Sequence, residues 1–269
     1  MFDLTHETDK LLALYRFSST NAKWLEVQTS GNVPPALVNM SLVVVNEFAY
    51  HFGGASKSDY LTSNLMYKLN LKTFEWARIS STENVPLHRH GHGMVAVGTL
   101  IYVFGGAKYI YLQDLYTFNI VNNQWTVLNS TGGMPSSRAF FGMAAISNII
   151  YVFGGEGTMP VDSSGQTKND MYAFDTSSQS WADISQTGYR PQSRYGQAMA
   201  AVGTDIYLYG GSTGEDTNLY MLDVASYRWS IVAAAGAQPS ARYKVGMAAI
   251  GNDLFLFGGY TKKNSGEAN

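Results

Sequence analysis

A spacing pattern that recurs five times constrains the fold of this chain more than any other feature. Every tryptophan has a tyrosine nine residues before it and a proline ten residues after it, and a Gly-Gly pair begins nineteen residues after that proline. The tryptophans are Trp24, Trp76, Trp125, Trp181 and Trp229. The stretch from the tyrosine to the first glycine is 38 residues long in each copy. Such constancy indicates a repeat architecture in which one rigid unit is copied along the chain.

All the length variation lies between the Gly-Gly pair and the next tyrosine. The four variable segments are 55–66, 107–115, 156–171 and 212–219. A framework that tolerates insertions at only one place indicates that these segments are surface loops. The longest, 156–171, is rich in glycine and serine, and we expect it to be mobile and able to close over a ligand.

Each unit contains four strand-like segments. The first is apolar but built from small residues, as in Gly142–Ile146, and the second ends at Gly-Gly, as in Ile101–Phe104. The third carries the tyrosine and the fourth carries the tryptophan, with short turns between them. A four-stranded antiparallel meander repeated in this way predicts the blades of a β-propeller, with the small residues of each first strand near the central axis.

The motifs resemble those of the Kelch repeat: Gly-Gly, tyrosine and tryptophan separated by eight residues, proline, and the Arg89-His90-Gly91-His92-Gly93 segment. The resemblance covers about residues 15–259. It implies an all-β, Kelch-type β-propeller of five four-stranded antiparallel blades. The chain opens with a third and a fourth strand and closes with a first and a second, so we expect these pairs to join in one closing blade. Residues 1–14 would be an N-terminal extension and 260–269 a polar tail.

Antiparallel order places the variable loops and the links between blades on one face. That face should also hold the residue three positions after each repeat proline, which is Arg89, Arg138, Arg194 and Arg242 in four copies and Leu37 in the first. In Kelch adaptors the matching arginines ring the mouth of the central channel and grip acidic peptide motifs. The alternative, left open by the sequence, is that they fix the strand starts by donating hydrogen bonds to nearby carbonyl groups.

This face is the predicted binding surface, because tyrosine and arginine are frequent hot-spot residues in interfaces. The predicted partner-binding residues are Arg89, His90, His92, Arg138, Phe140, Arg194, Tyr195, Arg242, Tyr243, Tyr60, Tyr109, Tyr111 and Glu156. The sequence therefore favours a non-catalytic protein-interaction scaffold that binds a peptide or protein, with acidic or hydroxyl groups on the ligand.

Two catalytic or metal-binding interpretations compete with this one. His88, His90 and His92 alternate along the chain and could ligate zinc or copper. Only one copy of the repeat has this cluster, however, and no acidic residue lies next to it. We therefore expect neither a metal nor another cofactor. Loop carboxylates could instead form an acid–base pair in a carbohydrate-active or small-molecule-binding five-bladed enzyme. That alternative predicts Glu156 and Glu215 within about 10 Å of each other. The other candidate carboxylates are Asp59, Asp162 and Asp216.

Composition limits the classes of partner and the cellular compartment that we expect. The net charge is −2 and charged residues make up 14% of the chain, so there is no clustered positive field to bind nucleic acid or an anionic membrane. The absence of cysteine excludes disulfides and thiolate chemistry. The polar, acidic first ten residues do not resemble a secretory signal, and we expect a cytoplasmic location. The oligomeric state cannot be predicted from the sequence.

Overall fold

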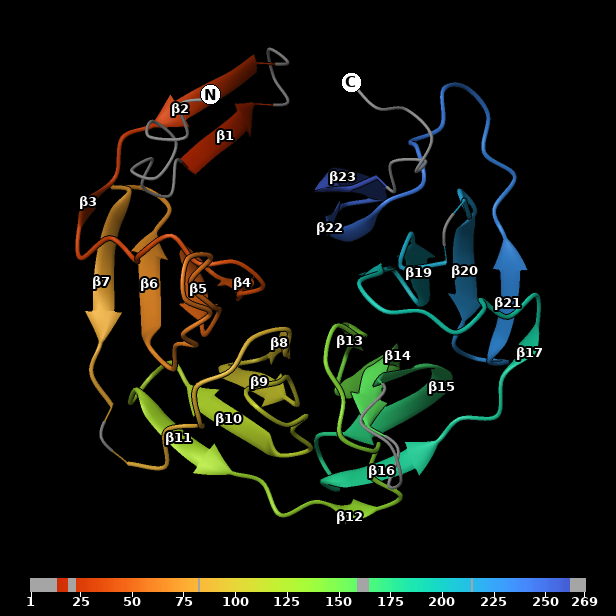
Figure 1. Cartoon of the computed structure of the whole chain (residues 1–269), viewed down its shortest axis with the longest axis horizontal. Coiled ribbons are helices and arrows are strands. Elements are labelled where there is room, and N and C mark those ends of the chain that lie inside the picture. The colour runs from red at the N-terminus through yellow and green to blue at the C-terminus, as the bar shows by residue number, and fades with distance from the viewer. Residues whose placement is uncertain (1–13, 19–22, 82, 159–164, 214, 262–269) are drawn as a thin grey trace.

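The computed structural model describes residues 14–18, 23–81, 83–158, 165–213 and 215–261. These residues form small antiparallel sheets arranged radially around a central channel (Figure 1). The described residues contain no helix, and so none that could cross a membrane. The all-β propeller arrangement is therefore confirmed.

Four complete blades follow one another around the ring, each with its strands in chain order from the channel outward. The first blade comprises β4 (Ser41–Val45), β5 (Phe48–Phe52), β6 (Met66–Asn70) and β7 (Glu75–Ile79). The second comprises β8 (Gly93–Val97), β9 (Leu100–Phe104), β10 (Leu115–Asn119) and β11 (Gln124–Val127). The third comprises β13 (Gly142–Ile146), β14 (Ile149–Thr158), β15 (Gly165–Asp175) and β16 (Ser180–Asp183). The fourth comprises β18 (Ala198–Val202), β19 (Asp205–Tyr209), β20 (Leu219–Asp223) and β21 (Arg228–Ile231).

Packing between neighbouring blades explains why the repeat residues recur. The tryptophan on each fourth strand meets the phenylalanine that precedes Gly-Gly in the preceding blade. The ring centroids lie 5.0 Å apart for Phe52–Trp125, 5.2 Å for Phe104–Trp181 and 5.4 Å for Phe153–Trp229. These pairs sit in three apolar clusters, one at each boundary between complete blades. Burial of such large rings supplies most of the packing energy between blades.

Short links connect the outer edge of one blade to the next. The segments β3 (Ser30–Gly31), β12 (Thr131–Gly132) and β17 (Thr187–Gly188) each pair in parallel with the fourth strand of the blade that follows. The glycine of each link has a left-handed backbone, with φ between 76° and 79°. A β-carbon there would lie 2.2 Å from the carbonyl oxygen of Trp76, Trp181 or Trp229. Glycine is therefore required where the link passes under the tryptophan backbone.

At the channel, the fifth residue after each proline joins consecutive blades by a backbone hydrogen bond. Gly91 donates to Asn39, Phe140 to Gly91, Gly196 to Phe140 and Lys244 to Gly196, over 2.6–2.8 Å. Each of these residues has a positive φ, including Asn39, Phe140 and Lys244, which are not glycine. The bonds form a continuous series from the first blade to the last inner strand, which holds the inner ends of the blades in register.

Among the described residues the expected closing blade is not formed, and four complete blades are present in place of the predicted five. The N-terminal pair, β1 (Leu14–Ser18) and β2 (Lys23–Val27), and the C-terminal pair, β22 (Tyr243–Ile250) and β23 (Asp253–Tyr260), are separate two-stranded sheets. Figure 1 shows them on opposite sides of a gap in the ring. Leu14 packs against the first blade, and β22 packs against β18 of the fourth.

One ion pair of the complete blades has no counterpart in the sequence at this junction. In each complete blade that begins with the repeat arginine, that arginine pairs with an aspartate that lies two or four residues before the tyrosine of the third strand. If β1 were the third strand beside β23, the acid for Arg242 would have to stand two or four residues before Tyr15. Those two positions hold Ala13 and Leu11, which are both apolar. The sequence thus has no aspartate at the positions that would match Asp114, Asp170 or Asp216.

The predicted N-terminal extension, C-terminal tail and longest loop include residues that the structure does not describe. The extension at 1–14 and the tail at 260–269 lie almost wholly outside the described residues. The segment 156–171 is less a loop than a continuation of the sheet, because β14 and β15 pair as far as Thr158 and Gly165, with a register shift between Phe153 and Gly155. Residues 159–164, at its tip, lie outside the described part of the chain, so its closure over a ligand stays untested.

Candidate functional site

The repeat arginines are part of the framework. The side chains of Arg89, Arg138 and Arg194 have no exposed surface. Each donates from Nε to the carbonyl oxygen two residues before it and from Nη1 to the carbonyl oxygen of the first glycine of its Gly-Gly pair. They also form ion pairs with Asp114, Asp170 and Asp216 at 2.6, 2.8 and 2.7 Å.

A ligand could reach these guanidinium groups only by displacing their aspartates. The expectation that Arg89, Arg138 and Arg194 grip an acidic peptide is therefore corrected, and the alternative role at the strand starts agrees with the geometry. A signal for this was present in the sequence. Each buried arginine has an aspartate two or four residues before the tyrosine of its own copy, whereas the first copy has Leu37 and, at the matching place, Leu65.

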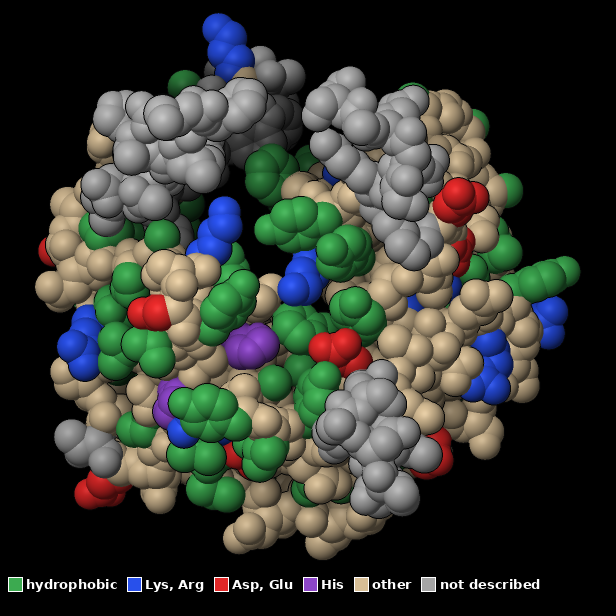
Figure 2. Space-filling view, viewed as in Figure 1, with side chains coloured by type: hydrophobic (Ala, Val, Ile, Leu, Met, Phe, Trp, Pro, Cys, Tyr) green, Lys and Arg blue, Asp and Glu red, His purple; other side chains and the backbone are tan. Residues whose placement is uncertain are grey.

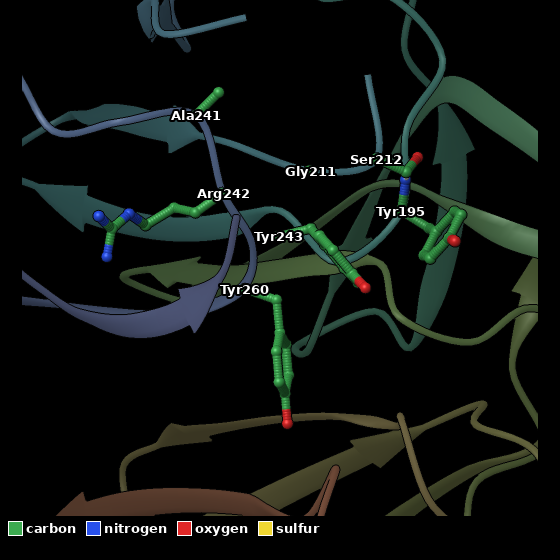
Figure 3. A pocket seen from close by; sticks show the side chains of 7 residues that line it. All are labelled: Tyr195, Gly211, Ser212, Ala241, Arg242, Tyr243 and Tyr260. Carbon is green, nitrogen blue, oxygen red and sulfur yellow. The ribbon is translucent and has the colours of Figure 1, made fainter. Parts of the chain in front are cut away.

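Arg242 differs from the other three. It keeps the same carbonyl partners, Ser240 at 3.1 Å and Gly258 at 2.8 Å, but no described carboxylate pairs with it. Its side chain is partly exposed and borders a surface cavity of about 190 Å³ with Tyr195, Tyr243 and Tyr260. Figure 3 shows that its guanidinium group extends away from Tyr195 and Tyr243.

The mouth of the channel is lined by positions whose residues differ between copies. Most of these positions are the fourth or fifth residue after each proline, or the residue after each Gly-Gly pair. The fourth residue after the proline forms an isolated β-bridge with the residue after Gly-Gly, as His90 does with Ala107 and Ala139 does with Glu156. We call the following residues the channel mouth: His90, Tyr111, Phe140, Glu156, Tyr195, Tyr243, Lys244 and Tyr260. The framework residues are nearly identical in every copy, so these variable positions are the ones that could confer selectivity.

Aromatic rings form an arc around this mouth. Phe140 lies 5.6 Å from His90 and 6.3 Å from Tyr195, and Tyr243 lies 5.7 Å from Tyr260, measured between ring centroids. The Lys244 ammonium lies 4.6 Å from the centre of the Phe140 ring, which is cation–π distance. Figure 2 shows a hollow at the centre of this face, bordered mostly by hydrophobic side chains with a few charged and histidine side chains among them.

Below the mouth, a cavity of about 390 Å³ extends into the channel. Residues from all five inner strands or their entries line it, including Asn39, His92, Phe140, Gln197 and Lys244. Lys244 is the charged residue of this lining, and it has no carboxylate partner among the described residues. The cavity is thus open to a ligand side chain that carries a hydrogen-bond acceptor.

Glu156 supplies the negative charge of the mouth. Burial raises the pKa of the Tyr111 phenol to about 12, and the Glu156 carboxylate, which accepts a hydrogen bond from Tyr111, adds to that shift. Burial, Glu156 and Tyr243 together raise the pKa of Tyr195. Both tyrosines are therefore neutral at physiological pH, and Tyr111 donates a hydrogen bond to the carboxylate.

The histidines expected at the site divide into two environments. His90 lies at the mouth, and burial together with Lys244 lowers its pKa, so it is neutral at pH 7. His92 is 5% exposed behind the mouth and packs on Phe52, with ring centroids 5.3 Å apart. His88 bonds instead with Thr62. Among the described residues no group of three histidine or acidic side chains is arranged to hold a metal ion.

The remaining predicted residues lie farther out on the loops. Tyr60 and Tyr109 are 79% and 87% exposed, next to the exposed Leu61 and Ile110. Tyr60 has a left-handed backbone with φ of 57°, in a turn where the Asp59 carboxylate accepts a hydrogen bond from the Leu61 N–H. Glu215 is exposed and borders another cavity with Arg190 and Asp216, and no described contact brings it to Glu156. Asp162 lies outside the described residues.

Comparison with known proteins agrees with this architecture. The model of the KLHDC2/KLHL20/DRC7 Kelch-repeats domain family matches residues 4–155 and 143–269. The chain is 33% identical over 93 residues to human Kelch domain-containing protein 3, which is 35% of this chain and 24% of that protein. It is 31% identical over 104 residues to Kelch domain-containing protein 10 of Xenopus tropicalis, 38% of this chain and 25% of that protein.

A third relative is the mouse leucine-zipper-like transcriptional regulator 1, which is 37% identical over 91 residues, 31% of this chain and 10% of that protein. The chain thus spans about a quarter or less of the length of these curated relatives. The family match, by contrast, extends over nearly every residue and over each copy of the motif. With its repeated motifs and its radial sheets, this chain belongs to the Kelch-repeat domain family.

Proposed function

We propose that this chain is a non-catalytic protein-interaction module that binds a peptide or an extended protein segment at the channel mouth. One observation carries the proposal. The framework residues are nearly the same in each copy, whereas the residues of the channel mouth differ from copy to copy. These variable residues bring half-buried aromatic rings together with the Glu156 carboxylate and the Lys244 ammonium group. Aromatic side chains in partly desolvated clefts provide much of the affinity in protein interfaces. Membership of the Kelch-repeat family supports an interaction role.

The charges of the mouth suggest what the bound segment contains. Glu156, which already accepts a hydrogen bond from Tyr111, would accept further hydrogen bonds from a hydroxyl, amide or cationic group. Lys244 in the channel cavity would donate to an acidic or carbonyl group. An acidic ligand therefore remains a reasonable expectation, with Lys244 in the place first given to the buried arginines. No described contact favours the enzymatic alternative, and the cytoplasmic location stays a prediction.

A site-directed cross-link tests this proposal. A photo-reactive phenylalanine derivative at Tyr195 should capture the bound segment, which mass spectrometry then identifies, and a synthetic peptide of that segment is titrated against purified variants. Combined Tyr195→Ala and Tyr243→Ala changes should weaken binding of the peptide at least tenfold, because two aromatic contacts are lost.

The control is Tyr189→Ala, which removes a tyrosine that is 68% exposed and lies outside the channel mouth. This variant should bind the peptide as tightly as the unmodified chain. If the Tyr189→Ala variant loses as much affinity as the double variant, or if the double variant loses none, the channel mouth is not the binding site.

A further inference from the structure

The framework of this chain binds a guanidinium group in the same way three times. In each case a buried arginine pairs with an aspartate and also lies over the ring of a tyrosine on the third strand. The distance from the guanidinium carbon to the ring centre is 5.5 Å for Arg89 and Tyr116, 5.3 Å for Arg138 and Tyr172, and 5.1 Å for Arg194 and Tyr220. A carboxylate beside a phenol ring is therefore the arrangement with which this fold holds a guanidinium group.

The copy in the fourth blade shows how the phenol and the carboxylate cooperate. Asp216 Oδ2 accepts hydrogen bonds from Arg194 Nη2 at 2.7 Å and from the Tyr220 hydroxyl at 2.8 Å. The phenol thus orients the carboxylate while its ring packs on the arginine. Arg194 has no exposed surface, so this site is already filled by the chain itself.

The channel mouth has the same acceptor groups without the arginine. The Glu156 carboxylate accepts a hydrogen bond from the Tyr111 hydroxyl, as Asp216 does from Tyr220. The charge of Glu156 also contributes to the raised pKa of Tyr195, which brings a second phenol into its surroundings. Glu156, Tyr111 and Tyr195 are half-buried. Among the described residues no ion pair includes Glu156, so its charge is available to a ligand.

The repeat gives no structural reason for an acid at this position. The other copies have Ala55, Ala107, Ser212 and Tyr260 after their Gly-Gly pairs. The backbone of Glu156 is fixed in the same kind of bridge as theirs, because its N–H donates to the Ala139 carbonyl at 2.9 Å and its carbonyl accepts from the Ala139 N–H at 2.8 Å. An acid that the framework does not need, on a fixed backbone at the mouth, favours a role in binding.

Lys244 carries the positive charge of the channel mouth, but it occupies a different part of it. Its ammonium group lies over the Phe140 ring, and its charge helps to lower the pKa of His90. The charge of Glu156 acts instead on Tyr111 and Tyr195. The two charges therefore have separate aromatic surroundings, and one ligand can meet both.

We propose that the segment bound at the channel mouth carries an arginine whose guanidinium group pairs with the Glu156 carboxylate and lies against the rings of Tyr111 and Tyr195. This inference rests on the proposed function and adds the side chain that the ligand must contain. Arginine suits the site better than lysine, because a planar guanidinium group can donate two parallel hydrogen bonds to a carboxylate and stack on a phenol ring.

A library of short random peptides, in which arginine and lysine are equally frequent, tests the identity of this side chain. The immobilised protein should enrich peptides that contain arginine, and Glu156→Gln should abolish that enrichment. The matched control is Glu215→Gln, which changes an exposed carboxylate that borders a different cavity and should leave the enrichment intact. Enrichment without a preference for arginine, or a preference that survives in Glu156→Gln or is lost equally in Glu215→Gln, overturns the proposal.

Titration of the most enriched arginine peptide tests the pairing itself. Citrulline in place of its arginine keeps the shape but removes the charge, and it should weaken binding at least tenfold. Glu156→Gln should weaken binding of the arginine peptide by a similar factor, and citrulline should then cost nothing further, as expected when two changes remove one interaction. Independent losses contradict the pairing.

A charge reversal provides a second variant. Glu156→Arg should bind the same peptide with glutamate in place of its arginine more tightly than it binds the arginine peptide, because the attraction is restored with the signs exchanged. The opposite preference in this variant counts against a direct contact between the arginine and residue 156.

The results also distinguish a failure of this inference from a failure of the proposed function. If no peptide is enriched, or if the enriched peptides bind the Tyr195→Ala, Tyr243→Ala double variant as tightly as the unmodified chain, the channel mouth is not a peptide site and both proposals fall. If binding requires these tyrosines but neither arginine nor Glu156, the arginine assignment alone is wrong.

Discussion

The repeat arginine occupies one sequence position in two different surroundings. Arg89, Arg138 and Arg194 are buried and each is bound to an aspartate, while Arg242 keeps the backbone bonds without the acid. Removing a buried arginine would leave its aspartate and a glycine carbonyl without their donor. Removing the partly exposed arginine would cost little, because water can solvate the groups it leaves behind.

The pair Arg138→Ala and Arg242→Ala should therefore differ in stability. We expect Arg138→Ala to lower the free energy of unfolding by about 3–5 kcal/mol, and Arg242→Ala to lower it by less than about 1 kcal/mol. Urea unfolding followed by tryptophan fluorescence measures both. Similar losses in the two variants would show that the ion pair with Asp170 does not stabilise the fold.

The repeat spacing identified these arginines as equivalent positions but left both of their possible roles open. Whether a repeat arginine is buried depends on where the aspartate before the third strand lies. That aspartate stands two residues before the tyrosine for Asp114 and Asp170, but four residues before it for Asp216. The channel mouth was partly predictable, since His90, Phe140, Tyr195 and Tyr243 follow from their repeat positions. Lys244 and Tyr260 were not predicted, because their place at the mouth is seen only from their contacts with Phe140 and Tyr243.

At the scale of the element, the link between blades depends on its glycine for two reasons. Gly132 has a left-handed backbone, and its Cα lies directly under the Trp181 carbonyl. Gly236 shares the backbone conformation but faces open space. The two positions therefore separate the cost of backbone strain from the cost of a steric clash.

An alanine at each link glycine tests this separation. Gly236→Ala should cost about 1–2 kcal/mol of unfolding free energy, the usual penalty for a side chain in the left-handed region. Gly132→Ala should cost at least about 1–3 kcal/mol more, because the link must also move away from β16. Thermal or urea unfolding gives both values. Equal costs would mean that the link shifts freely and that its pairing with β16 contributes nothing.

For the whole molecule, the radial arrangement was predictable from the fixed spacing, because identical units that bury both faces must pack around a common centre. The inner strands of all five copies do line one channel. Closure was not predictable from the phase of the repeat. It depends on whether the last strand finds a matching partner, and among the described residues β1 and β23 lie in separate two-stranded sheets. A repeat pattern thus predicts packing between neighbours better than it predicts what occupies the final position.

Two buried histidines should make the stability of the whole molecule sensitive to acid: His51, on the face of the first blade that carries Trp76, and His92, which packs on Phe52. Burial lowers the pKa of His51 to about 4, and burial together with Arg89, His51 and His90 lowers that of His92 well below its ordinary value. No hydrogen-bond partner is present among the described residues for either nitrogen of these two rings. His51 occupies a position that holds Val103, Val152 and Leu208 in the complete blades that follow.

The sign of the effect follows from these pKa values. Above pH 6.5 both histidines are neutral in the folded and unfolded chain. Between about pH 6.5 and 4 the unfolded chain takes up protons that the folded chain cannot accept, so the unfolding free energy falls as the pH falls, by about 3 kcal/mol for His51 alone. His51→Leu should remove this share of the slope and be more stable than the unmodified chain at pH 4.5. At pH 8 the two should differ by less than about 1.5 kcal/mol, because leucine suits the apolar position. Urea unfolding at pH 8, 6 and 4.5 measures the slope, and parallel curves for the two proteins would show that His51 is not the source of the acid sensitivity.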